Sequence, residues 1–148
     1  MESNERIFAD TNFFVALFHP ADALHEDARQ IATVCSAAST LFVISNFIFL
    51  ETVTVLSQRR GKDIAIAAGN YLLSNPFIEV VHVDEALQRE TWNIFRNTPA
   101  KNTSFVDASI MAILKVEEIS TLLTFDIKDF VALRKQHHFQ FYVQKNNA

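Results

Sequence analysis

The chain has few residues of the kinds that cross-link, break or sharply turn a backbone. Its 148 residues include one cysteine, two glycines and three prolines. A single cysteine, Cys35, excludes an intrachain disulfide, and its small apolar neighbours predict a core position. Scarce glycine and proline leave most turns to Asn, Asp and Ser.

Several functional signals are also missing. The sequence contains no HExxH, CxxC, GxSxG or phosphate-binding loop, and its five histidines show no metal-ligand spacing. Residues 1–8 have neither the basic nor the long apolar region of a secretory signal. The most apolar stretch, residues 41–56, is too short and too polar to cross a bilayer. We therefore expect a cytoplasmic protein that does not enter the membrane.

Composition indicates a globular chain. Hydrophobic residues make up 49% and charged residues 20%, and the length suits one domain over residues 1–148. The net charge of -4 argues against a non-specific DNA coat protein. It does not exclude a nucleic-acid enzyme, because bound metal ions offset the charge of an acidic pocket.

Apolar segments of strand and helix type alternate along the chain. We expect strands at residues 7–9, 41–44, 77–83, 121–124 and 139–143. We expect helices at residues 11–18, 21–38, 46–60, 63–74, 85–96, 105–116 and 130–135. Thr11, Ser45, Asp84 and Ser104 are the expected N-caps, and Gly61 ends the third helix. This order predicts an α/β fold with a parallel sheet covered by helices on both faces.

Four carboxylates lie beside apolar runs that otherwise indicate core: Asp10, Glu51, Asp107 and Asp126. A buried carboxylate is costly unless it is paired, hydrogen-bonded or bound to a cation. Ligands of open parallel sheets bind beyond the carboxyl ends of the strands, where these residues would converge. We therefore predict one acidic pocket that binds a hard divalent metal ion.

Structural alternatives exist for each carboxylate. Asp10 could simply help to start a helix, and Glu51 could form a buried ion pair with Arg59, Arg60 or another basic residue. Asp107 could serve a capping box with Ser104, although it also lies on the apolar stripe of its helix.

Near the fourth strand, Asp126 and Asp129 could be turn residues, and Asp126 is the better ligand candidate because it lies closer to the strand end. Asp129 fits the N-cap of the following helix better than a ligand role. Lys101 and Lys128 lie beside acidic positions in the sequence and are candidate phosphate contacts.

Four segments in this order resemble the PIN-domain family, and within it the VapC-like toxins of bacterial toxin–antitoxin pairs. They are IFADTNFFVALF, FIFLETVTVL, SFVDASIMAIL and LLTFDIKDF. The resemblance spans essentially the whole chain. It implies a three-layer α/β/α fold and an endoribonuclease that depends on Mg²⁺ or Mn²⁺, with one or two ions. It also implies a homodimer and a small antitoxin protein as partners, with RNA as substrate.

The resemblance assigns the four acidic family positions to Asp10, Glu51, Asp107 and Asp126, as catalytic residues and metal ligands. Asp129 falls on a further acidic position with a less certain part in metal binding. The small polar positions that orient ligands fall on Asn12, Ser104 and Thr124. The chain departs from the family in having no glycine before Ser104 and Lys128 in place of an arginine.

Two rival functions remain at this point. A phosphatase of the haloacid dehalogenase type requires Asp-x-Asp after the first strand, where this chain has Asp10-Thr11-Asn12, and it would leave Glu51 without a role. A non-toxin PIN-domain protein that processes or only binds RNA would share the fold. Retention of every acidic position argues against a site that has lost its chemistry.

Overall fold

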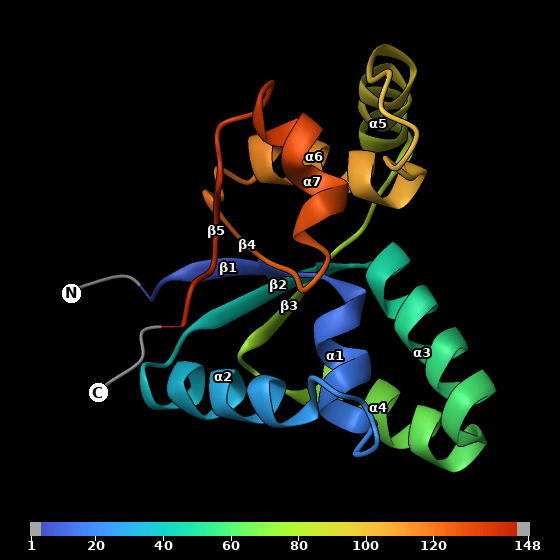
Figure 1. The fold of residues 1–148 in the computed structure, drawn as a ribbon, viewed down its shortest axis with the longest axis vertical. Helices are drawn as coiled ribbons and strands as arrows, with labels where there is room; N and C mark the ends of the chain where they lie inside the picture. The colour runs from blue at the N-terminus through green and yellow to red at the C-terminus, as the bar shows by residue number, and fades with distance from the viewer. Residues whose placement is uncertain (1–3, 145–148) are drawn as a thin grey trace.

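A five-stranded parallel sheet forms the centre of the computed structural model, which describes residues 4–144 (Figure 1). The strands are β1 (Arg6–Ala9), β2 (Leu41–Ser45), β3 (Ile78–Val81), β4 (Thr121–Leu123) and β5 (Gln140–Phe141). The helices are α1 (Thr11–Phe18), α2 (His25–Ala37), α3 (Asn46–Arg60), α4 (Lys62–Ser74), α5 (Glu85–Asn97), α6 (Phe105–Val116) and α7 (Ile127–Arg134). The predicted domain over 1–148 extends into residues 1–3 and 145–148, which lie outside the described part.

Strand order determines where a site can form. The order is β3-β2-β1-β4-β5, with Ile7 of β1 aligned to Phe42 of β2 and Phe8 aligned to Leu122 of β4. The chain builds outward from β1 to β3 and then crosses back to place β4 on the other side of β1. The carboxyl ends of β1 and β4 therefore flank the switch point of the sheet, where ligands bind in such folds.

Helices cover both faces of the sheet, as the alternation predicts. Helices α1 to α4 lie on one side and α5 to α7 on the other (Figure 1). The core between the layers is aromatic and aliphatic, and Phe8, Phe13, Phe14 and Phe130 are fully buried in it. Cys35 is buried as expected. None of the described helices has both the length and the apolar character needed to cross a membrane.

Local capping signals explain most helix starts. The side chains of Ser45, Asp84 and Ser104 each accept a backbone N–H of the helix that follows, as predicted. Gly61 ends α3 with φ of +93°, a backbone conformation that glycine adopts without strain.

Two capping predictions were wrong. The N-cap of α1 is Asp10, whose Oδ1 accepts the N–H of Thr11 at 2.8 Å, so Thr11 is the first helical residue. Helix α7 starts at Ile127, which places Asp129 inside its first turn and Asp126 at the N-cap position. The side chain of Asp126 makes no capping hydrogen bond and is left for other contacts.

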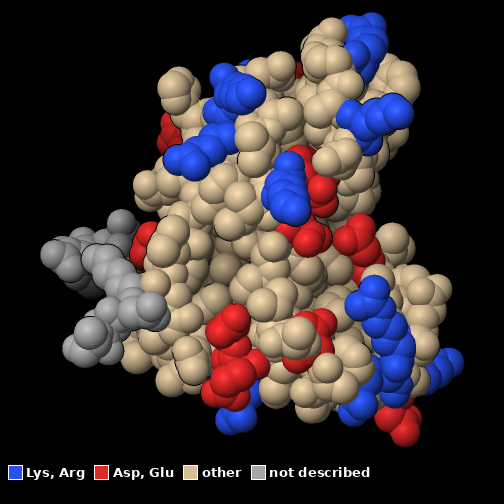
Figure 2. Space-filling model, in the orientation of Figure 1, with Lys and Arg blue, Asp and Glu red and all other residues tan. Residues whose placement is uncertain are grey.

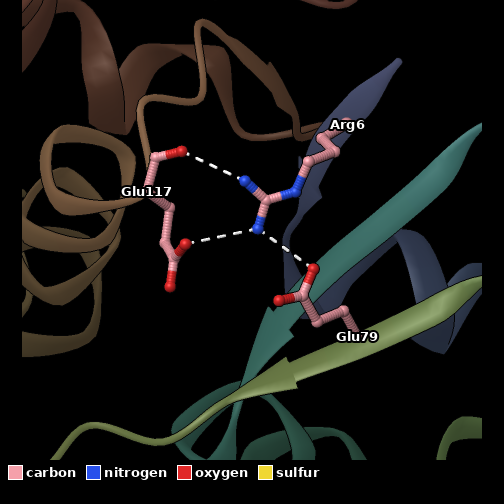
Figure 3. A network of polar contacts seen from close by, with 3 residues as sticks. All are labelled: Arg6, Glu79 and Glu117. Atoms are coloured by element: carbon pink, nitrogen blue, oxygen red, sulfur yellow. Dashed lines mark hydrogen bonds and ion pairs between the residues drawn. The ribbon is translucent and has the colours of Figure 1, made fainter. Parts of the chain in front are cut away.

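A polar network holds the amino-terminal edge of the sheet, opposite the switch point. Arg6 at the start of β1 donates to Glu79 of β3 at 3.0 Å and to the Glu117 carboxylate at 3.3 Å (Figure 3). It also donates to the Glu117 carbonyl at 3.1 Å. These contacts join the sheet to the end of α6.

Candidate active site

A pocket of about 460 Å³ opens at the carboxyl end of β1 and β4. Acidic side chains gather in the middle of the view in Figure 2, between α7 on one side and α1 and α3 on the other. The pocket is lined by Asp10, Thr11, Asn12, Val15, Asp22, Leu24, Glu51, Val55, Arg59, Asn102, Ser104, Val106, Asp107, Phe125, Asp126 and Asp129. The structure therefore brings all five predicted acidic residues into one cavity.

Asp10 is the most buried of the carboxylates that line this pocket. It is 6% exposed, because it follows the central strand directly and its backbone N–H donates to the Leu123 carbonyl of β4. Its Oδ1 accepts the Thr11 N–H, and its Oδ2 accepts the hydroxyl of Thr124 at 2.9 Å. Burial, with smaller contributions from the charges of Asp107 and Glu51, raises the pKa of Asp10 to about 7.

Asn12 connects the ends of the two strands. Its Nδ2 lies within donating distance of Asp10 Oδ2 at 3.3 Å, Thr124 Oγ1 at 3.1 Å and Asp126 Oδ2 at 3.2 Å. Its Oδ1 accepts the Phe125 N–H at 2.9 Å, and the Asp126 N–H donates to Thr124 Oγ1 at 3.1 Å. The amide of Asn12 and the hydroxyl of Thr124 thus fix the orientation of both carboxylates.

Asp107 caps its helix and also lines the pocket. It forms a capping box with Ser104, since Asp107 Oδ2 accepts the Ser104 N–H and Ser104 Oγ accepts the Asp107 N–H, each at 3.0 Å. It is also 9% exposed and lines the pocket. Burial, with smaller effects from the charges of Asp129 and Glu51, raises the pKa of Asp107 to about 6. Capping and a pocket position are compatible because the second carboxylate oxygen remains available.

Glu51 projects from α3 on the far wall of the pocket. The alternative of an ion pair with Arg59 or Arg60 is not seen, since Glu51 takes part in no ion pair or side-chain hydrogen bond among residues 4–144. Its negative charge contributes to the raised pKa values of both Asp10 and Asp107. The pocket therefore holds a set of carboxylates that no cation within residues 4–144 neutralises by direct pairing.

The donor set can be tested against a divalent cation on its chemistry. Carboxylate, amide and hydroxyl oxygens are the ligands that Mg²⁺ and Mn²⁺ prefer, and two of the carboxylates have pKa values raised mainly by burial. Within residues 4–144, no three acidic, histidine or cysteine side chains are already close enough to hold one ion. Ligation would therefore require side-chain rotation, as expected for carboxylates that repel each other.

Asp22, Asn102 and Arg59 also line the pocket, and none of them was predicted as a site residue. Asp22 and Asn102 come from loops, where no periodic signal marks a position as facing the pocket. Arg59 has such a signal, since it follows Glu51 and Val55 at successive intervals of four residues on α3. Lys101 and Lys128 are exposed and do not line the pocket, so their role as RNA contacts stays a prediction.

Known proteins resemble this chain in sequence and in fold. The family model described as PIN domain matches residues 7–135. The 23S rRNA-specific endonuclease VapC20 of Mycobacterium tuberculosis is 32% identical over 120 residues, which cover 81% of this chain and 88% of VapC20.

Solved structures show the same fold. The crystal structure of Mycobacterium tuberculosis VapC20, described as a sarcin–ricin loop cleaving toxin, has a TM-score of 0.74 at 29% identity, covering 88% of this chain and 95% of that one. VapBC2 from Rickettsia felis, bound to a DNA fragment from its promoter, has a TM-score of 0.68 at 16% identity, covering 93% and 99%. The latter similarity concerns the fold alone.

Proposed function

This chain belongs to the PIN domain family, and we propose that it is a metal-dependent endoribonuclease that hydrolyses RNA phosphodiester bonds. The observation that carries the proposal is the pocket at the switch point, where buried Asp10 and Asp107 lie with Glu51, Asp126 and Asp129 and where no cation of the described residues pairs with any of them. Its similarity to a 23S rRNA-specific endonuclease supports the same reaction class. The nuclease would be a single domain over residues 1–148.

Asp10, Glu51, Asp107 and Asp126 would hold one or two Mg²⁺ or Mn²⁺ ions, with Asp129 as a further ligand. A divalent ion at this position supplies a Lewis acid that stabilises the negative charge developing on a phosphodiester during hydrolysis. The surrounding residues keep the ligands in place: Asn12 and Thr124 orient Asp10 and Asp126, and Ser104 orients Asp107. Such supporting hydrogen bonds usually matter nearly as much as the ligands themselves.

The substrate proposed from the relatives is 23S rRNA, at the sarcin–ricin loop. An rRNA substrate would be met in the cytoplasm. The similarity to VapC20, which is described as a toxin, further supports the role of the toxin in a type II toxin–antitoxin pair. Such a toxin would form a homodimer and bind a small antitoxin protein. A PIN-domain protein that processes RNA without an antitoxin is the alternative.

Purified protein would be incubated with a sarcin–ricin stem-loop oligonucleotide and with 23S rRNA, in Mg²⁺ or Mn²⁺ and in EDTA. The informative variant is Glu51→Gln, because Glu51 makes no side-chain hydrogen bond among the described residues that its removal would break. Asp27→Asn, an exposed site on α2, is the matched charge control.

We expect cleavage that requires the metal ion, is lost in Glu51→Gln and persists in Asp27→Asn. Equal cleavage in EDTA, or full activity of Glu51→Gln, would contradict the proposal. Growth arrest on expression of the wild type but not of Glu51→Gln would support the toxin role over RNA processing.

A further inference from the structure

One cationic side chain stands in the wall of the acidic pocket. Among the described residues that line it, six are carboxylates and Arg59 is the single positive group. Arg59 comes from the last turn of α3, and Lys and Arg side chains gather over this helix beside acidic ones (Figure 2). The simplest role for an arginine in this position would be to neutralise one of the carboxylates by forming an ion pair with it.

Arg59 does not perform that role. Within residues 4–144 its guanidinium takes part in no ion pair and no side-chain hydrogen bond. It lies eight residues after Glu51, which is about 12 Å along the helix axis at 1.5 Å per residue. Its five N–H donors therefore have no protein acceptor among the described residues, and the side chain lines the pocket.

Its neighbour Arg60 gives a natural comparison. Both residues are exposed and both lie in the last turn of α3, where a positive charge interacts favourably with the helix dipole. Only Arg59 lines the pocket, because it continues the stripe of Glu51 and Val55. A role confined to the helix end would be shared by the two arginines, whereas a role in the pocket would belong to Arg59.

We propose that Arg59 is a positioning residue that binds a backbone phosphate of the RNA next to the one that is cleaved. The inference rests on the proposed nuclease function. A pocket of six carboxylates repels a polyanion, so the strand needs a cationic contact that leaves the metal ligands free. A guanidinium binds phosphate oxygens through two parallel hydrogen bonds, which fixes orientation as well as position.

The geometry also gives the path of the strand. Because the Cα of Arg59 lies about 12 Å along the helix axis from that of Glu51, Arg59 would contact a phosphate next to the one at the acidic centre. The RNA would then run along α3, from the carboxylates towards Gly61. The contact would hold substrate and transition state equally, which changes KM rather than kcat.

Arg59→Ala, Arg59→Lys and Arg60→Ala would be compared as full-length proteins, with the sarcin–ricin stem-loop oligonucleotide as the probe. Steady-state cleavage gives KM and kcat. Fluorescence anisotropy of the labelled probe, in the Glu51→Gln background so that it is not cut, gives Kd between 50 and 300 mM salt.

We expect Arg59→Ala to raise KM and Kd by roughly 10-fold or more, with kcat changed less than about threefold, since a charge-assisted contact is lost. The slope of log Kd against log salt should fall by about 0.7–0.9, the range for one phosphate contact to a single strand or a duplex. Arg59→Lys should keep the slope and lose part of the affinity. Arg60→Ala should match the wild type within about twofold.

The possible outcomes distinguish the role of Arg59 from the nuclease function. Cleavage by the wild type with equal effects of Arg59→Ala and Arg60→Ala would overturn the assignment of Arg59 and leave the nuclease function standing. Binding that depends on Arg59 without cleavage would support the RNA contact and refute the nuclease. A folded wild type that neither binds nor cuts RNA would overturn both.

Discussion

The buried carboxylate of Asp10 is predicted to destabilise the metal-free protein at neutral pH. The pKa of Asp10 is raised from 3.8 to about 7, mainly by burial. Asp10→Asn keeps the size and one acceptor oxygen of the protonated acid and cannot ionise. We therefore expect Asp10→Asn to be more stable than the wild type in EDTA at pH 8.

The magnitude follows from the pKa difference. The interval from 3.8 to about 7 is about three pKa units, and each unit corresponds to about 1.36 kcal/mol. Ionisation of Asp10 thus lowers the free energy of unfolding by roughly 4 kcal/mol at a pH well above the folded pKa. Over the practical range of pH 5 to 8, about 2–3 kcal/mol of this should be seen, because the difference grows only up to the folded pKa.

The sign is fixed by proton binding. Between pH 3.8 and about 7 the folded state holds more protons at Asp10 than the unfolded state does. The contribution of Asp10 to stability is therefore fully present below its unfolded pKa and is lost as pH rises through the folded pKa. Asp107, with its pKa raised to about 6, acts in the same direction and is common to both proteins.

Urea unfolding in EDTA at several pH values measures the effect. The control is Asp84→Asn, because Asp84 is also an N-cap aspartate but is exposed. We expect the stability gap for Asp10→Asn to widen with pH and level off above 7.5, and the gap for Asp84→Asn to stay near zero. A gap that is constant with pH, or that favours the wild type at pH 8, would refute the argument. Added Mg²⁺ should narrow the gap, since an ion that binds only the folded wild type stabilises it.

Three further predictions each concern a single substitution. Asn12→Ala removes the hydrogen bonds that orient two pocket carboxylates and should lower metal affinity and cleavage by about 10–100-fold with circular dichroism unchanged. Gly61→Ala should lower the free energy of unfolding by about 1–2 kcal/mol through backbone strain alone, since φ is +93° and no atom lies within 4 Å of the new Cβ; an unchanged urea midpoint would contradict this. Arg6→Gln breaks partly exposed contacts to Glu79 and Glu117, so it should cost about 1 kcal/mol or less, and less still in 0.5 M salt.

Local chemistry made much of the fold predictable. Alternating apolar segments gave the order of strands and helices, and the caps at Ser45, Asp84 and Ser104 were confirmed because a cap depends on residues within one turn. Boundaries were less certain: the second helix begins at His25 rather than residue 21, and β3 covers Ile78–Val81 rather than residues 77–83. The ends of these elements depend on packing partners that the sequence does not show.

The errors at Thr11 and Asp129 have one cause. In both places two neighbouring residues had capping propensity. The position at which the preceding strand ends decided which of the two became the N-cap. Pairing of β1 with β4 holds Asp10 at the strand end through its N–H bond to Leu123, which leaves Asp10 to cap α1. A propensity scale assigns no such position.

The sequence by itself determined which residue types the site would have, because carboxylates beside apolar runs are too costly to be incidental. Only the tertiary structure decided that they meet. Asp10 and Asp126 lie more than a hundred residues apart, and they share Asn12 because β4 pairs with β1 rather than with β3. The helical spacing of four residues places Arg59, and not Arg60, on the stripe of Glu51 and Val55, but only the packing of α3 in the assembled layers decided that this stripe faces the pocket.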